Sequence, residues 1–171
     1  MDSIRIDRLL KPMKIFRGVY ASDRLPKSPR NGVYIVNLDP SNLPGSHWVA
    51  IYLHNHLAEY FDSYGLPPFI RNIRKFLKPF TVTRNRIQIQ SFHSDICGEY
   101  CCLYTASKSL GQTLHKFLTQ FHHTIPHLND CRVLKLFDRT FNEVRSERRC
   151  HPHAQRCCSR INTLHRSKKY H

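Results

Sequence analysis

The chain has 171 residues, of which 40% are hydrophobic and 23% charged. This length favours a single domain with its own core, and the apolar content excludes a wholly disordered chain. No stretch approaches the roughly 20 consecutive apolar residues of a membrane-spanning helix, and the charged start lacks the apolar run of a signal peptide. We therefore expect a soluble intracellular monomer that is not secreted and binds no membrane.

The chain is strongly basic: 27 Lys and Arg against 12 Asp and Glu give a formal net charge of +15 with neutral His. Such an excess is typical of proteins that bind polyanions, because each cation placed on a phosphate releases a condensed counterion. We expect nucleic acid as a partner, the alternative being a merely basic soluble surface. Residues 139–171 alone hold nine Lys and Arg against two acids. We therefore expect a domain at 1–145 and a flexible basic tail, rich in Cys and His, at 146–171.

All seven cysteines lie at or after Cys97, so no disulfide framework can hold the first 96 residues together. With no signal peptide, this favours reduced thiols in the cytosol or nucleus. Each cysteine is then catalytic, metal-bound or simply buried.

The first half of the chain predicts mainly strands, because β-branched and aromatic runs alternate with Gly, Pro and Asn. In chain order we expect a helix at Asp2–Leu10, a loop around Arg17–Gly18 and Leu25–Pro26, and strands at Gly32–Leu38, Trp48–Leu53 and Ala58–Phe61. The first of these strands is too apolar for a sheet edge. The last two form a central hairpin with a tight turn at Asn55.

The second half predicts mainly helices, because its apolar residues recur at helical spacing. In chain order we expect a helix at Phe69–Leu77, a strand at Arg86–Gln90, and helices at Cys97–Leu110, Leu114–His122 and Leu128–Val144. The fold class is therefore α+β, with a small mixed or antiparallel central sheet packed by helices.

Four polar residues stand at predicted strand ends or at a helix start, in the order His47, Asp62, Gln90 and Cys97. A helix N-terminus and a neighbouring imidazolium both favour the thiolate, which is the attacking form of cysteine. His47 would take and return the proton, and Asp62 would orient its ring. The Gln90 amide and the Cys97 backbone N–H would stabilise the oxyanion.

Local motifs around these residues resemble the adenovirus maturation protease (adenain) and related cysteine proteases of Maverick/Polinton-type DNA transposons, in a clan shared with ubiquitin-like-protein proteases. The matching segments are Phe16–Tyr20 with Leu25–Pro26, Gly45–Ala50, Tyr60–Gly65 and Cys97–Tyr104. The family's oxyanion Gln lies seven residues before its nucleophile, where this chain has Gln90. The matches span roughly residues 16–110.

The resemblance implies an adenain-like, papain-like fold with Cys97 as nucleophile at a helix N-terminus, His47 as base, Asp62 as acid and Gln90 as oxyanion donor. It further implies an endopeptidase for viral or transposon capsid and other precursors, acting in the nucleus or virion. Small residues such as Gly would flank the scissile bond, in a channel walled by Trp48, which is otherwise a core residue. Catalysis would need no cofactor and no metal, while DNA and a peptide activator would stimulate the enzyme.

This chain departs from the adenovirus pattern at two points. The acid is Asp62, where those enzymes usually have Glu, but the ubiquitin-like branch uses Asp. No cysteine precedes Cys97, so a peptide activator would have to bind without a disulfide.

The sequence also allows other interpretations. The same residues fit an isopeptidase that removes a ubiquitin-like modifier, or a nucleic-acid-binding protein with a silent protease fold. Alternate bases are His54, His56 and His93, and Asp95 is an alternate acid that more readily caps the helix. A zinc site could form in the tail, from Cys150, His151, His153, Cys157, Cys158 and His165.

Overall fold

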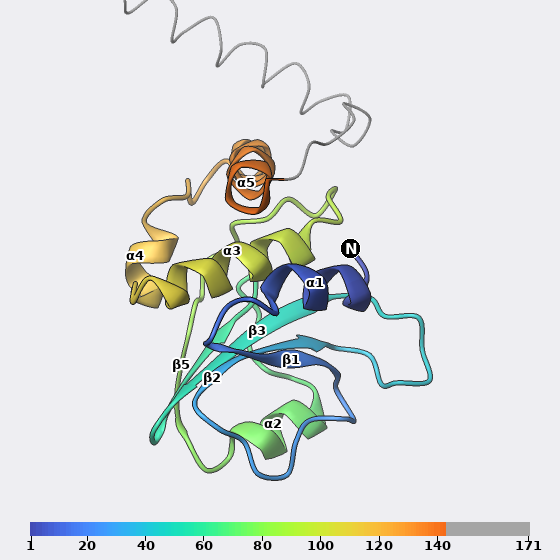
Figure 1. The fold of residues 1–171 in the computed structure, drawn as a ribbon. Coiled ribbons are helices and arrows are strands. Elements are labelled where there is room, and N and C mark those ends of the chain that lie inside the picture. The colour runs from blue at the N-terminus through green and yellow to red at the C-terminus, as the bar shows by residue number, and fades with distance from the viewer. Residues whose placement is uncertain (143–171) are drawn as a thin grey trace, which may run out of the picture.

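The computed structural model describes residues 1–142. The domain boundary expected at residue 145 and the tail at 146–171 lie outside these residues. The elements are α1 (Ser3–Leu10), β1 (Phe16–Ala21), β2 (Gly32–Asn37), β3 (Trp48–His54), β4 (Leu57–Phe61), α2 (Arg71–Leu77), β5 (Thr81–Arg84), α3 (Cys97–Ser109), α4 (Leu114–Leu118) and α5 (Pro126–Phe141) (Figure 1).

The strands form one mixed sheet in the order β1-β2-β3-β4-β5. β2, β3 and β4 pair antiparallel, while each outer strand runs parallel to its neighbour. Helices α1, α3, α4 and α5 lie on one face of the sheet and α2 on the other (Figure 1). The α+β class, the mixed sheet and the interior position of the hairpin are thus confirmed.

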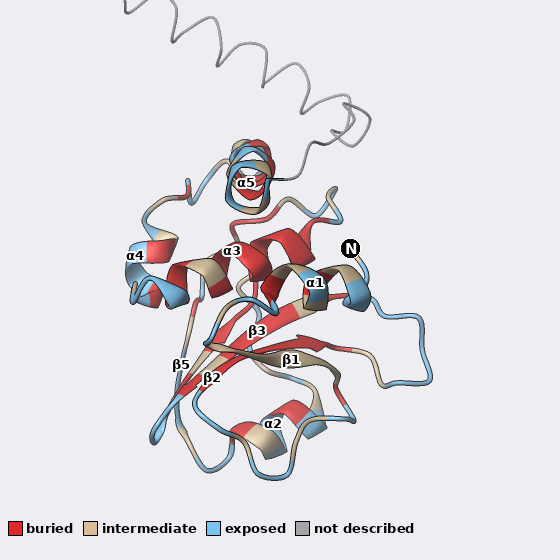
Figure 2. Ribbon diagram, in the orientation of Figure 1, coloured by how far each residue is buried: buried red, intermediate tan, exposed pale blue. Residues whose placement is uncertain are grey.

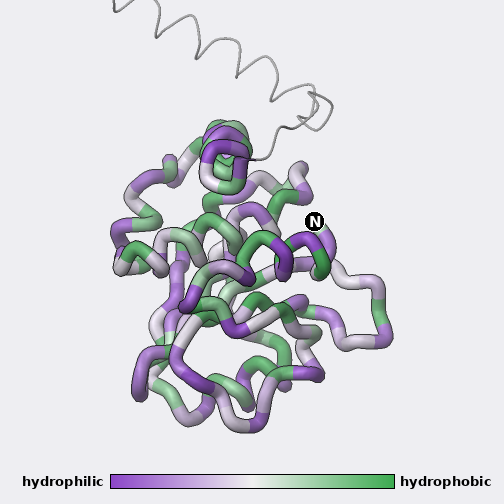
Figure 3. Tube along the Cα trace, in the orientation of Figure 1, coloured by the Kyte–Doolittle hydropathy of each residue, from purple (hydrophilic) through white to green (hydrophobic). Residues whose placement is uncertain are grey.

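Alternation along the strands divides the buried apolar residues into two cores. Val33, Ile35 and Ala50 face the larger core, which holds α1, α3, α4 and α5. Tyr34 and Val36 face the smaller core beneath α2. Buried positions therefore run along both sides of the sheet (Figure 2), and hydrophobic residues are interspersed with hydrophilic ones along the trace (Figure 3).

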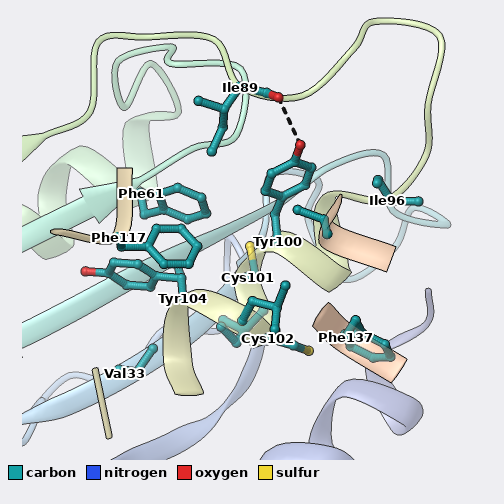
Figure 4. Close-up of a cluster of buried hydrophobic side chains, with 14 of the residues drawn as sticks. Val33, Phe61, Ile89, Ile96, Tyr100, Cys101, Cys102, Tyr104, Phe117 and Phe137 are labelled. Carbon is teal, nitrogen blue, oxygen red and sulfur yellow. Dashed lines mark hydrogen bonds between the residues drawn. The ribbon is translucent and has the colours of Figure 1, made fainter. Parts of the chain in front are cut away.

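Helix α3 lies at the centre of the larger core. Its residues from Cys97 to Thr105 are all buried, and Tyr104 stacks on Phe61 of β4 with ring centroids 4.8 Å apart. Figure 4 shows these rings packed with the neighbouring side chains of α4 and α5. Because α3 is fixed on all sides, the residue at its start has a fixed position in the molecule.

The segment around Arg17–Gly18, which the sequence predicts to be a loop, is part of a strand. Phe16–Ala21 forms β1, parallel to β2, with an irregularity in register between Phe16 and Gly18. Gly18 has a φ of +124°, which marks a bulge within the strand. Gly18, which in the sequence favours a loop, therefore forms a bulge in an edge strand.

The strand expected at Arg86–Gln90 is not formed; the strand lies earlier, at Thr81–Arg84 (β5). The backbone N–H groups of Ile89 and Gln90 both donate to the Ser63 carbonyl, at 2.9 and 3.1 Å, so they join no ladder. Residues 86–90 instead lie along the turn that follows β4. Ile87 and Ile89 still reach the larger core, which explains their strand-like alternation.

The expected helices all form, with different ends. The helix expected at Leu114–His122 is only the short α4. The one expected at Leu128–Val144 begins earlier, at Pro126, and ends at Phe141, where Asn142 adopts a left-handed conformation with a φ of +50°.

Candidate active site

The sheet places His47 and Asp62 at one edge. His47 directly precedes β3 and Asp62 directly follows β4, and the two strands are antiparallel with Ala50 opposite Phe61. The start of one strand therefore lies beside the end of the other, which brings together side chains 15 positions apart.

Within this edge, His47 Nε2 lies 2.8 Å from Asp62 Oδ1. Asp62 is fully buried, and the same oxygen accepts a 2.8 Å hydrogen bond from the Tyr64 backbone N–H. The Asn85 side chain bonds both backbone groups of Asp62, accepting from its N–H at 3.0 Å and donating to its carbonyl at 2.5 Å. The carboxylate is thus fixed in position before any substrate binds.

An aromatic ring covers the His47 imidazole. Tyr64 stacks on His47 with ring centroids 4.7 Å apart, and Phe92 stacks on the outer side of Tyr64 at 5.3 Å. The His47 residue is only 8% exposed. This row of rings screens the His47–Asp62 pair from water, which strengthens it.

Cys97 is the first residue of α3 and is 7% exposed. Its sulfur therefore lies at the positive end of the helix dipole. A Cβ built on Gly98 would lie 3.0 Å from Met1 Cβ and 3.5 Å from Trp48 Cδ1. The nucleophile candidate is therefore flanked closely by the N-terminal segment and by Trp48.

The imidazole links Cys97 to Asp62. Burial lowers the pKa of His47, but the hydrogen bonds and charges of Asp62 and Cys97 outweigh it and raise the pKa to about 9. Because Nε2 faces Asp62, Nδ1 is the ring nitrogen that remains for the Cys97 thiol. The arrangement can hold an imidazolium beside the Cys97 sulfur at neutral pH.

Gln90 is fully buried and lies in a loop rather than at a strand end. Its Oε1 accepts from the Ser63 hydroxyl at 2.6 Å, and its Nε2 lies 2.8 Å from the Ser94 carbonyl and 3.3 Å from the Tyr64 hydroxyl. The amide is therefore fixed at both ends. Tyr64 joins it to the site, because the same ring stacks on His47.

Trp48 is half-buried, and its indole N–H donates to the Met1 carbonyl at 2.9 Å. It lines a cavity of about 610 Å³ whose other lining residues include Met1, Val19, Asn37, Leu43 and Gly45. Met1 and Trp48, which line this cavity, also flank Gly98, the residue after the nucleophile candidate.

The alternate residues lie elsewhere. His54, His56 and His93 are exposed, so none matches the buried, carboxylate-bound position of His47. Asp95 is exposed too, and the position before α3 is held by Ile96 with no side-chain cap. The expectation that Asp95 caps the helix is therefore wrong.

Four described cysteines, Cys97, Cys101, Cys102 and Cys131, are buried. Among residues 1–142 no three His, Cys, Asp or Glu side chains gather as a metal site. The zinc ligands considered in the tail lie outside the described residues. Over the same range no helix is long and apolar enough to cross a membrane.

Sequence reasoning missed the supporting residues Ser63, Tyr64, Asn85 and Ser94. Ser63 and Tyr64 belong to the segment that follows Asp62 and could be suspected from that motif. Asn85 and Ser94 carry no comparable pattern, because their partners lie 23 and 4 residues away in the chain.

No protein-family model matches the chain, and no curated protein matches it. Among solved structures, it is similar to a crystal structure of the ASFV pS273R protease, with 20% sequence identity, a TM-score of 0.49, and coverage of 77% of this chain and 65% of that one. For a Se-Met crystal structure of that protease the identity is 24%, the TM-score 0.43, and the coverage 68% and 46%. The chain thus spans less than two thirds of the length of either.

Proposed function

We propose that the chain is a cysteine peptidase. The observation that carries the proposal is the line from Asp62 through the buried imidazole of His47 to Cys97 at a helix N-terminus. A buried carboxylate that orients an imidazole next to a thiol is the arrangement that activates a nucleophile.

The reaction takes two steps. The Cys97 thiolate attacks the scissile carbonyl carbon, and His47 gives its proton to the leaving amine as the C–N bond breaks. This leaves a thioester on Cys97. His47 then removes a proton from water, and the resulting hydroxide attacks the thioester carbonyl carbon. The C–S bond breaks, which returns the Cys97 thiolate beside the imidazolium and releases the second product as a carboxylic acid.

The oxyanion of each tetrahedral intermediate needs donors already in place. We assign the Cys97 backbone N–H and one of the two Gln90 amide hydrogens to this role. Gln90 Nε2 lies 2.8 Å from the Ser94 carbonyl, 3.2 Å from the Ser94 hydroxyl and 3.3 Å from the Tyr64 hydroxyl. The hydrogen given to the oxyanion would be the one not bound to the Ser94 carbonyl.

The cavity beside Trp48 supports a channel for the acyl side of the substrate. Its walls include Met1 and Trp48, which close in on Gly98, so residues as small as Gly would fit next to the scissile bond. We propose endopeptidase cleavage of viral or transposon precursors, as the motif resemblance implies. Release of a ubiquitin-like modifier ending in Gly-Gly is the second candidate, because it would use the same channel.

We also propose that DNA stimulates the enzyme, in the nucleus or the virion. The net charge of +15 supports this, as does a group of exposed basic residues around α2, on the sheet face opposite α3: Arg71, Arg74, Lys75 and Lys78. A non-covalent peptide activator remains compatible with a chain that has no cysteine before Cys97.

A cleavage assay tests the function. The full chain should cut peptides that carry Gly-Gly before the scissile bond, and Cys97→Ala and His47→Ala should abolish cleavage while leaving the fold intact. Cys102→Ala, which removes another buried thiol of α3, should keep cleavage. Full activity of the Cys97 variant would refute the mechanism, and cleavage only of a modifier attached to lysine would favour the isopeptidase.

A further inference from the structure

A carboxylate outside the proposed catalytic residues is buried between α5 and the loop that carries Gln90. Asp130 of α5 is only 6% exposed. Its carboxylate lies 2.9 Å from the Tyr100 hydroxyl and accepts from the Ser91 backbone N–H at 3.3 and 3.4 Å. Burial raises the pKa of Asp130 to about 6, while hydrogen bonds from Tyr100 and from the Ser91 backbone limit the rise. The carboxylate is therefore a buried hydrogen-bond acceptor for the Ser91 backbone N–H.

The residues beside Asp130 hold the same loop at a second point. The Tyr100 hydroxyl of α3 lies 2.9 Å from the Ile89 carbonyl (Figure 4). The Asn129 side chain donates to that carbonyl at 3.0 Å. Ile89 directly precedes Gln90, and Ser91 directly follows it. The backbone is thus fixed on both sides of Gln90, at one carbonyl and at one N–H, by side chains of α3 and α5.

The loop passes this constraint to the Gln90 amide. After Ser91 the chain turns, and the Ser94 hydroxyl donates back to the Ser91 carbonyl at 3.0 Å. The Ser94 carbonyl then accepts from Gln90 Nε2 at 2.8 Å. Asp130 therefore holds the start of the turn whose end sets the direction of the amide.

An apolar residue at position 130 would avoid the cost of burying a charge in this core. A carboxylate has an advantage where several N–H and O–H donors must be held at once, because it is the acceptor with the most lone pairs. Its donors here all belong to the loop or to the tyrosine that holds the loop.

We propose that Asp130 is a positioning residue for the oxyanion hole, which it orients from α5 through the Ser91–Ser94 turn and Gln90. This inference rests on the proposed peptidase function. Helix α5 would then contribute to turnover as well as to the hydrophobic core.

The test compares Asp130→Ala and Asp130→Asn with the wild-type full chain. For each, kcat and KM for a Gly-Gly peptide substrate are measured, together with the rate at which iodoacetamide alkylates Cys97, located by mass spectrometry. Alkylation passes through no oxyanion, so it reports thiolate activation alone. Val133→Ala is the matched control, because it removes buried volume from the same helix and leaves the Asp130 contacts in place.

We expect Asp130→Ala to lower kcat about 10-fold, with KM and the alkylation rate within about 2-fold of wild type. Asp130→Asn keeps one acceptor oxygen and should recover most of kcat, and Val133→Ala should keep kcat. A normal kcat in Asp130→Ala would overturn the inference. Equal losses of turnover and alkylation, or a matching loss in Val133→Ala, would also overturn it, since they show a general structural effect. A wild-type chain that alkylates but cleaves nothing would instead refute the proposed function.

Discussion

Asp62 Oδ1 receives both the His47 ring N–H and the Tyr64 backbone N–H at 2.8 Å. This double contact fixes which ring nitrogen faces the carboxylate and leaves the other one for Cys97. The local electrostatics of the site then rest on the imidazolium form of His47, whose pKa stands at about 9 against an ordinary value of 6.5.

A pH dependence of stability follows from this shift. The folded state binds the His47 proton more tightly than the unfolded chain, so the stabilisation is fully present below about pH 6.5 and is lost as the pH rises through about 9. We expect the free energy of unfolding to fall by about 1 to 3 kcal/mol across this window. Urea unfolding at several pH values measures it.

His47→Gln is the control for that experiment, because it removes the titrating ring and keeps a polar side chain. Its unfolding free energy should vary much less between pH 6.5 and pH 9. An equal fall in both proteins would assign the effect to other groups.

The Gln90 amide is expected to act in the transition state only. Gln90→Ala should therefore lower kcat by about 10²- to 10³-fold while KM changes little. Steady-state kinetics on a peptide substrate measure this, and a rise in KM with unchanged kcat would contradict the assigned role.

Single residues were predictable where chemistry restricts the residue type. Cys97, His47, Asp62 and Gln90 could be selected as candidates because few side-chain types can serve as a nucleophile, a base, an acid and an amide donor, and the structure places His47 Nε2 2.8 Å from Asp62 Oδ1. Asn85 could not, because it acts through hydrogen bonds to the Asp62 backbone that any polar side chain in the right place could make.

At the scale of elements, the turn after β4 and residues 86–90 form one unit. The Gly65 N–H closes the turn on the Asp62 carbonyl at 2.8 Å. Gly65 has a φ of +72°, and a Cβ there would lie 2.7 Å from the Ile87 backbone carbon. The close approach of this turn to the Ile87 backbone therefore depends on glycine.

We expect Gly65→Ala to lower the free energy of unfolding by about 2 to 4 kcal/mol, from left-handed strain and backbone overlap together. Gly111→Ala is the matched control, because Gly111 has the same φ of +72° but nothing within 4 Å of its Cβ position. It should cost about 1 kcal/mol. Equal losses in denaturant titrations would contradict the close packing of the turn on residue 87.

Strands and helices were predictable where the local apolar pattern agrees with the strand pairing or helix packing of the fold. This is so for β2, for the hairpin of β3 and β4, and for α3. The prediction failed at β1, because Gly18 forms a bulge within a strand, and at Arg86–Gln90. There the apolar alternation reflects core contacts, while the hydrogen bonds go to the Ser63 carbonyl instead of a neighbouring strand.

At the scale of the whole molecule, the +15 charge predicts salt-dependent DNA binding. The logarithm of the association constant for duplex DNA should fall linearly with the logarithm of salt concentration. Replacing Arg74 and Lys75, both exposed on α2, with Gln should reduce the slope by about 2. Fluorescence anisotropy measures this, and binding without salt dependence would contradict a phosphate-binding surface.

Convergence of the site is a property of the whole fold, and the sequence alone could not establish it. His47 and Asp62 meet because β3 and β4 are antiparallel in one particular register, and Cys97 joins them because α3 packs across that sheet. These relations depend on long-range packing that no local pattern encodes.

The most direct test of the account is to label the full chain with a thiol-directed peptide electrophile ending in Gly-Gly and to locate the adduct by mass spectrometry, because the chain has seven thiols. We predict selective modification of Cys97 that is lost in His47→Ala and faster with DNA. An unreactive Cys97, with adducts scattered over other cysteines, would contradict the peptidase and favour a DNA-binding protein with a silent protease fold.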